Sequence, residues 1–442
     1  MSRGVLAPVE LLVVQNARAF DPSVGLDQTA DAVIEGGILT RLGPGAGRNL
    51  AGEARARVID ARGRWLLPGF IDLRAHLGEP GFEYKETLES GLRAAAAGGF
   101  TQVCCTPDTD PINDEPVVTE WLRSRAARTS PVQLHPIAAA TRGFEGKLLT
   151  EMGALRQAGA VAVGDANHSI GSSEVLRRVL EYARDFDLPL FQHAEDHALT
   201  HGSDMNEGVV ATRLGLRGAP SVAEHAVVAR DVLIAEYTGG RYHASLVSTA
   251  RSVDTIRTAK EHGARVSCAA GVHHLLLSEE AIESYDPNFK LVPPLRHVGD
   301  VEALLRGLAQ GEVDAVVSDH RPQSILQKDC EFPEAEPGTI GLEVCFSVLL
   351  SLVLDGKLSL ARAVSALTSG PAAVLGVPAP RLEAGQRADL VLVAADEHWR
   401  VDAQSLHGRS HNSPLYGRSL PGRIELTLAQ GRLAFDRLAK PA

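Results

Sequence analysis

Short runs of apolar residues alternate with longer amphipathic stretches through the middle of the chain, from about residue 69 to residue 376. Short apolar runs are typical of buried strands, whereas the longer stretches repeat with the period of a helix. The apolar runs lie at 69–76, 101–106, 132–138, 161–166, 189–194, 241–247, 265–270 and 313–320. Eight alternations of strand and helix predict an α/β fold built on a (β/α)8 TIM-type barrel.

The pattern changes on both sides of this span. AVIEGGILTRLG before it, and RADLVLV and RIELTLAQGRLAF after it, predict short strands separated by glycine turns. Neither flank is long enough to bury a good core alone, so we expect both chain ends to build one small β-sandwich domain. The predicted division is a barrel at 68–376 inserted between the two parts of the small domain, 1–67 and 377–442.

Charge and composition restrict the class of partner. The chain has 44 Lys and Arg against 55 Asp and Glu, a net charge of −11 that repels nucleic acids and anionic membranes. The segment MSRGVLAPVELLVVQN lacks the features of a secretory signal, and no apolar run has the length of a membrane helix. We therefore expect a cytoplasmic protein without a nucleic-acid or membrane partner. The five cysteines show no disulfide or metal-binding spacing.

Polar side chains stand at the ends of several predicted strands, which in such a barrel face a common mouth. Imidazole and carboxylate groups that meet from different strands suit a divalent metal such as zinc. Taken singly, each of these residues also fits a core histidine or a helix cap, but their shared position favours a metal hydrolase site. The residues are Arg74, His76, Asp165, His193 and Asp319.

The segment PGFIDLRAHLGEPGFEYKETLESGLRAAAAGGFTQVCCTPDTDPIND (68–114) resembles the dihydroorotases of the amidohydrolase superfamily, in their longer bacterial class. The segments MNEGVVATRLGL (205–216), HHLLLSEEAI (273–282) and YDPNFKLVPPLR (285–296) are similar to further parts of that family. The resemblance implies a zinc-dependent, reversible closure of N-carbamoyl-aspartate to dihydroorotate in pyrimidine synthesis. It also implies that His76, Asp165, His193 and Asp319 match metal ligands, with Asp319 as the catalytic base.

Other positions depart from the family pattern. Arg74 and Leu246 stand where the family has its first and last metal-binding histidines. Substrate-binding positions are changed as well, including the arginine and the asparagine that contact the substrate. These changed positions are Gly78 for the arginine, Asp108 for the asparagine, Val292, Arg321 and Gln323.

A guanidinium carries a permanent positive charge, so we expect Arg74 to replace a metal electrostatically and to pair with Asp165 or Asp319. A two-metal centre is then not expected, although the remaining ligands could hold one zinc. The leading hypothesis is a non-catalytic homo-oligomer, similar to the inactive dihydroorotase homologues that assemble with aspartate transcarbamoylase. The alternative is an active amidohydrolase for dihydroorotate or another ureide, with a single metal and with Asp108 and Arg321 contacting substrate.

Overall fold

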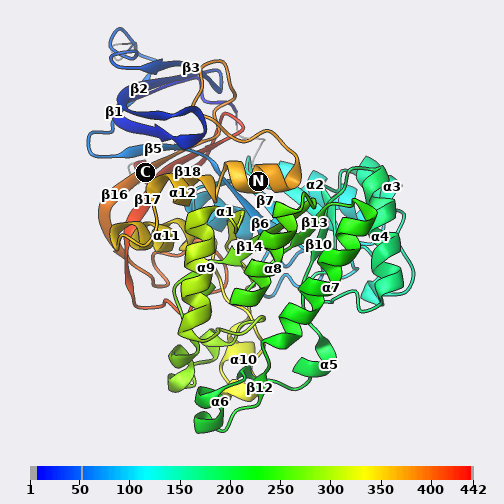
Figure 1. Ribbon diagram of the computed structural model, residues 1–442. Helices are drawn as coiled ribbons and strands as arrows, with labels where there is room; N and C mark the ends of the chain where they lie inside the picture. Colours follow the sequence, from blue (N-terminus) through cyan, green and yellow to red (C-terminus); the bar gives the residue numbers. More distant parts are fainter. Residues whose placement is uncertain (1–6, 51–52, 440–442) are drawn as a thin grey trace.

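Eight parallel strands form the centre of the molecule, as seen in a computed structural model that describes residues 7–50 and 53–439 (Figure 1). The first six residues of the N-terminal segment considered above lie outside that part. Each predicted apolar run overlaps one strand, and neighbouring strands pair in chain order. The strands are β6 (Phe70–Ala75), β7 (Phe100–Cys105), β8 (Gln133–Ala138), β9 (Ala162–Val163), β10 (Leu190–Gln192), β13 (Tyr242–Ala244), β14 (Val266–Gly271) and β15 (Ala315–Val317).

The first and last of these strands adjoin. Ala75 at the end of β6 forms a parallel bridge with His320, and the amide of His76 donates to the carbonyl of His320 at 2.8 Å. The sheet therefore curves into a nearly closed barrel, which confirms the fold expected from the sequence. In such a barrel the carboxyl ends of all strands face one mouth.

Helices surround the barrel, and their apolar faces cover its strands (Figure 1). In α4, for example, Ser172 caps the first turn, and Val175, Leu176, Val179, Leu180 and Ala183 form the buried stripe. The helices are α1 (Leu88–Ala97), α2 (Pro116–Thr129), α3 (Met152–Ala158), α4 (Ser173–Asp185), α5 (His197–Thr200), α6 (Val209–Leu214), α7 (Val222–Thr238), α8 (Ala250–Glu261), α9 (Val298–Gln310), α10 (Ile325–Lys328), α11 (Cys345–Leu354), α12 (Leu360–Ser365) and α13 (Ser369–Leu375). Within residues 7–50 and 53–439, every helix is too short or too polar to span a lipid bilayer.

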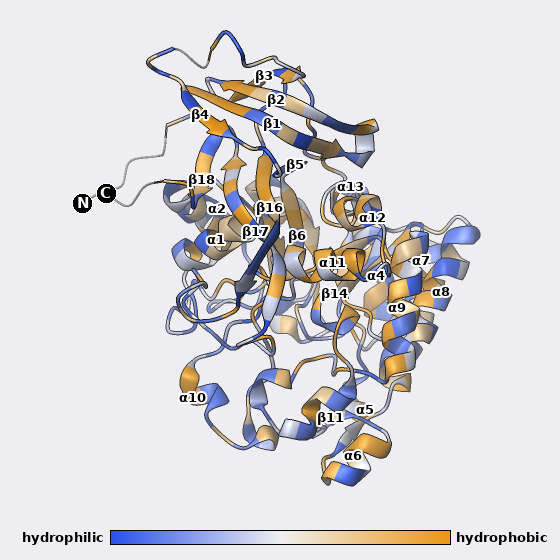
Figure 2. Cartoon of the chain, turned by 90° about the vertical axis from the view of Figure 1, so that its left-hand side faces the viewer, coloured by the Kyte–Doolittle hydropathy of each residue, from blue (hydrophilic) through white to orange (hydrophobic). Residues whose placement is uncertain are grey.

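The two ends of the chain build a second sheet beside the barrel (Figure 2). Its order is β18-β17-β16-β5-β1-β2-β3, and β4 also pairs with β1. The sheet folds back on itself, because Gly37 between β2 and β3 bonds to Val9 and to Ala388 through its backbone. Its strands are β1 (Leu11–Asp21), β2 (Leu26–Glu35), β3 (Ile38–Gly43), β4 (Arg57–Asp60), β5 (Trp65–Pro68), β16 (Leu390–Arg400), β17 (Ser419–Ala429) and β18 (Arg432–Asp436).

The longer loops after the barrel strands project away from this terminal sheet. They carry α5, α6, α10 and the short pair β11 (Met205–Asn206) and β12 (Gly218–Ala219), which lie at the opposite end of the molecule (Figures 1 and 2). The mouth of the barrel, where the candidate residues stand, is therefore on the side remote from the terminal sheet.

Candidate functional site

Arg74 lies at the end of β6 and points into the barrel mouth. Its Nε donates to Oδ1 of Asp319 at 2.9 Å, and its Nη2 donates to the side-chain oxygen of Asn167. The exposed fractions of the Arg74 and Asp319 side chains are 7% and 12%, so little water screens the pair. Asp319 follows β15 with a φ of 47°, in the left-handed region that few non-glycine residues adopt. The guanidinium is thus bound to one of the candidate ligands, Asp319.

Asp165 follows β9 and is oriented toward the loop after β8. Its Oδ1 accepts from the amides of Ala140 and Thr141 at 2.8 and 2.9 Å, and its Oδ2 accepts from the Thr141 hydroxyl. Burial raises the pKa of this carboxyl to about 6, although these hydrogen bonds oppose the shift. Three donors therefore occupy the two oxygens of Asp165, and the carboxylate serves as a brace between two loops.

His76, Asp108 and Arg321 form a second group beside the first. Nε2 of His76 lies 3.0 Å from the backbone oxygen of Asp108, and Nη1 of Arg321 donates to Oδ2 of Asp108 at 3.1 Å. Burial raises the pKa of the Asp108 carboxyl, but the charges of His76 and Arg321 outweigh it and the net shift is downward. Oδ1 of Asp108 and Nδ1 of His76 are buried and have no hydrogen-bond partner among the described residues.

His193 follows β10 and is almost fully buried. Its Nε2 lies 2.7 Å from Oε2 of Glu195, whose carboxylate is also 3.7 Å from Nδ1 of His197. Burial raises the pKa of Glu195, but the hydrogen bond and charge of His193, together with Thr200 and His197, outweigh it and the pKa falls to about 2. One imidazole nitrogen of His193 is thus paired with a carboxylate of its own loop.

The changed family positions include Gly78, Leu246, Val292 and Gln323. Gly78 has a φ of 71°, and a Cβ built on it would lie 2.2 Å from the carbonyl oxygen of Glu86. Leu246 is buried in an apolar cluster with Phe191, and Gln323 donates to the carbonyl of Pro337 at 2.7 Å. Val292 lies between β14, which ends at Gly271, and α9, which begins at Val298, so it belongs to the long loop after β14. The contacts of Gly78, Leu246 and Gln323 therefore fit the residues that this chain has at these positions.

A small hollow lies beside Arg74 at the end of β6. It is lined also by Thr106, Ile137, Ala166 and Phe191, and it measures about 10 Å³. That volume is roughly what a single water molecule needs. Within the described part of the chain, no group of three or more His, Cys, Asp and Glu side chains is arranged to hold a metal ion. The donors, as they lie here, do not fit a two-metal centre.

The structure adds one residue to the site that the sequence pattern did not single out. Asn167 stands two residues beyond Asp165 and accepts from Arg74. The position of Asn167 in the sequence could have indicated its role, because residues just after a barrel strand face the mouth. The carboxamide oxygen completes the hydrogen bonding of the guanidinium without adding charge.

The amino-acid sequence is similar to a known protein family over most of its length. The model of a family described as "Dihydro-orotase-like" matches residues 63–252. The chain is 44% identical over 424 residues to a dihydroorotase of Syntrophotalea carbinolica, covering 96% of this chain and 99% of that protein. It is 42% identical over 440 residues to a dihydroorotase of Syntrophobacter fumaroxidans, with both chains covered in full.

A solved structure with the same fold is the L-hydantoinase (dihydropyrimidinase) of Arthrobacter aurescens, with a TM-score of 0.86 at 23% identity. The match covers 98% of this chain and 97% of that one. At this identity the likeness establishes the barrel and the terminal sheet, and it carries no information on substrate.

Proposed function

The chain belongs to the dihydroorotase family, and we propose that it is a non-catalytic member whose role in pyrimidine synthesis is structural. The observation that carries the proposal is the buried ion pair between Arg74 and Asp319, with Nε 2.9 Å from Oδ1. A guanidinium cannot lose its proton in a protein, so its charge at this point is permanent. It repels any metal cation that would approach Asp319.

The neighbouring groups support the same proposal. Both oxygens of Asp165 accept hydrogen bonds from donors of the loop after β8, so a metal would compete with these donors for the carboxylate. The hollow of about 10 Å³ beside Arg74 has no room for a pyrimidine ring. Asp108 brings a carboxylate to a position that would repel a dicarboxylate substrate. Binding of the family substrate in that hollow would therefore require side chains around it to move.

We further propose that the protein forms cytoplasmic assemblies with aspartate transcarbamoylase, as a homo-oligomer. The partner is inferred from the inactive dihydroorotase homologues that this sequence resembles. A fold kept intact around a filled site is what selection for assembly would preserve.

The proposal is tested by elemental analysis of the chain purified without chelator, together with assays of ring closure and ring opening. The Syntrophotalea carbinolica relative, prepared in the same way, serves as the matched control. We expect zinc far below one ion per chain and no turnover of dihydroorotate with added zinc. Mixing with the aspartate transcarbamoylase of the same organism is expected to give one larger species on a sizing column. Stoichiometric zinc with turnover would overturn the proposal.

A second candidate function is an active amidohydrolase with a remodelled, single-metal site. It is favoured by the full-length relatives, which are named dihydroorotases, and by the unpartnered Nδ1 atoms of His76 and His193. In that case Asp108 and Arg321 would contact the substrate, and Asp319 would leave Arg74 to act as base. This candidate predicts about one zinc per chain and metal-dependent hydrolysis of a cyclic ureide, so the same measurements separate the two.

A further inference from the structure

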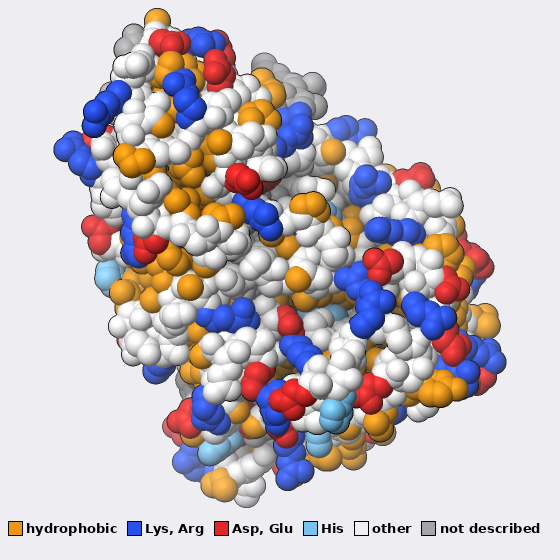
Figure 3. All heavy atoms as spheres, turned by 45° about the horizontal axis from the view of Figure 1, so that its top comes forward, with side chains coloured by type: hydrophobic (Ala, Val, Ile, Leu, Met, Phe, Trp, Pro, Cys, Tyr) orange, Lys and Arg blue, Asp and Glu red, His pale blue; other side chains and the backbone are white. Residues whose placement is uncertain are grey.

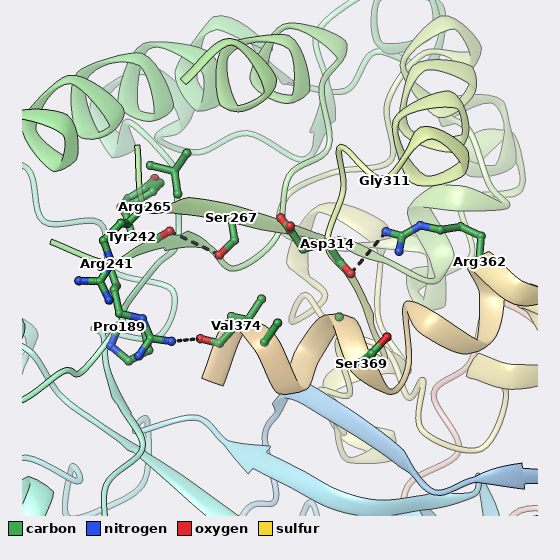
Figure 4. Close-up of a pocket in the computed structure, with 13 residues that line it drawn as sticks. Pro189, Arg241, Tyr242, Arg265, Ser267, Gly311, Asp314, Arg362, Ser369 and Val374 are labelled. Carbon is green, nitrogen blue, oxygen red and sulfur yellow. Dashed lines mark hydrogen bonds between the residues drawn. The ribbon is translucent and has the colours of Figure 1, made fainter. Parts of the chain in front are cut away.

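A hollow of about 360 Å³ opens at the amino-terminal end of the barrel strands, on the side opposite the mouth (Figure 4). Pro189, Arg241, Arg265 and Asp314 line it, and each comes directly before a barrel strand. The volume falls in the range of about 300 to 1,000 Å³ that is common for small-molecule sites. None of the candidate residues at the mouth lines this hollow.

Two of its guanidiniums share a single exposed carboxylate. Nη1 of Arg241 lies 3.4 Å, and Nη2 of Arg265 lies 3.2 Å, from Oδ1 of Asp187. The Asp187 side chain is 70% exposed, so solvent screens much of its attraction. Burial lowers the pKa of Arg241, and the charge of Arg265 lowers it further. This side of the hollow therefore carries more positive charge than its carboxylate neutralises.

The third guanidinium, that of Arg362, donates only to backbone oxygens. It bonds to the carbonyls of Leu308 at 2.6 Å, Val313 and Asp314. Carbonyls satisfy its N–H groups, but they do not cancel its charge. The Asp314 carboxylate is engaged by Lys260, with Nζ 2.7 Å from Oδ2. The charge of Arg362 thus has no dedicated counter-ion among the described residues.

The arrangement of these groups suits an anion with charge at both ends. Figure 4 places Arg241 and Arg265 on one side of the hollow and Arg362 with Ser369 on the other. The hydroxyl of Ser369 has no hydrogen-bond partner among the described residues and is available to a ligand. On the face shown in Figure 3, Lys and Arg side chains stand in several groups, with Asp and Glu side chains between them.

We propose that this hollow binds a small organic polyanion that carries two phosphate or carboxylate groups. Guanidinium groups form bidentate, charge-assisted hydrogen bonds with such anions, and partial burial strengthens them. The competing explanation is that the arginines only brace the base of the barrel through their carbonyl bonds. If the hollow binds an anion, a negative charge placed at position 369 weakens that binding. If the arginines only brace the barrel, the hollow has no specific anion site for such a charge to affect.

The test is isothermal titration calorimetry of the full chain with inorganic pyrophosphate and with citrate, against sodium chloride at matched ionic strength. We expect one saturable site, and the tighter of the two probes identifies phosphate or carboxylate as the preferred group. Ser369→Asp brings a negative charge into the hollow and leaves every arginine bond intact, so we expect at least a tenfold loss of affinity. Ser369→Asn, which is neutral and of similar size, is expected to bind within about threefold of the parent.

A second pair of variants tests the arginines. Arg265 is exposed and its side chain bonds to Asp187, so Arg265→Gln is expected to fold and to lose about tenfold in affinity. Arg178→Gln removes another exposed arginine, from α4 and outside the hollow, and is expected to bind as the parent does. Thermal melts establish that each variant is folded. The proposal fails if neither probe gives saturable heat, or if Ser369→Asp binds as tightly as Ser369→Asn.

Discussion

The side chains of Arg74 and Asp319 meet where the first and last strands of the barrel adjoin, with Nε 2.9 Å from Oδ1. Arg74 belongs to β6, and Asp319 follows β15 two residues after its last residue, Val317. The pair therefore links the two edges of the sheet beside the bridge between Ala75 and His320. In this position one ion pair both occupies the barrel mouth and holds the barrel closed.

Loss of Arg74 is expected to destabilise the protein strongly. Arg74→Ala leaves the buried carboxylate of Asp319 without its partner, and breaking a buried pair in this way costs about 3 to 5 kcal/mol. The free energy of unfolding in urea, measured for parent and variant at neutral pH, checks this.

The double variant Arg74→Ala, Asp319→Ala is the control for that measurement. Removal of both charges leaves no unpaired ion, so its cost is expected to be smaller than the sum of the single costs by at least about 1 kcal/mol. Additive costs would show that the two side chains are not coupled in solution.

Gly78 is expected to resist substitution. A Cβ there would lie 2.2 Å from the Glu86 carbonyl oxygen, and the φ of 71° disfavours any side chain. We expect Gly78→Ala to lose about 2 kcal/mol or more in the free energy of unfolding. Gly63 has a similar φ of 77° with nothing within 4 Å of the added Cβ, so Gly63→Ala isolates the conformational cost of about 1 kcal/mol.

The same contact bears on the arginine that the family has at this position. Gly78→Arg carries the same Cβ, so we expect it to be destabilised and to gain no affinity for dihydroorotate. Calorimetric titration of the folded fraction with dihydroorotate provides the readout. Tight binding by Gly78→Arg would mean that the backbone of this loop rearranges freely.

His243 is expected to make the protein sensitive to acid. Burial, reinforced by the charges of Lys260, Arg74 and Arg241, lowers its pKa to about 3. The unfolded chain takes up a proton near pH 6.5, whereas the folded one does so only near pH 3. Stability is therefore present above pH 6.5 and is lost as the pH falls, by about 1 kcal/mol per unit below pH 6.

His243→Asn is the matched variant, because its amide can retain a hydrogen bond to Ser267, whose hydroxyl lies 2.8 Å from Nδ1 of His243. The difference in unfolding free energy between parent and variant is expected to shrink from pH 7 to pH 4.5. A difference that stays constant with pH would refute the assignment to His243.

Glu224 is expected to be the most costly acidic residue to neutralise on α7. Its buried carboxylate accepts from the amides and hydroxyls of Ser248 and Thr249. Glu224→Gln turns one acceptor into a donor that faces these donors, at a cost of about 2 to 4 kcal/mol. Glu236→Gln changes an exposed residue of the same helix and is expected to alter the melting temperature by less than about 2 °C.

Much of the barrel could be predicted from the sequence, because buried parallel strands leave continuous apolar runs. The run at 161–166 shows the limit, since only Ala162 and Val163 of it are in strand β9. Asp165 leaves the ladder to accept from the amides of Ala140 and Thr141. Those donors are backbone groups of a distant loop, and backbone donors leave no mark in the sequence.

The candidate site, like the barrel, could be predicted only in part from the sequence. Charge alone left two carboxylates as possible partners of Arg74, and only the fold decides that Asp319 is within reach while Asp165 is turned away. The arginines of the second hollow precede strands. The rule that places function at the carboxyl ends of strands therefore does not point to them.

The terminal sheet has a consequence for synthesis of the chain. Strand β5 lies between β1 and β16, so its antiparallel partner leaves the ribosome more than 300 residues after it does. At about 5 to 20 residues per second, β5 waits for tens of seconds with one edge open. The barrel is translated during that interval, so β16, and then β17 and β18, complete the terminal sheet only after the whole barrel has been synthesised.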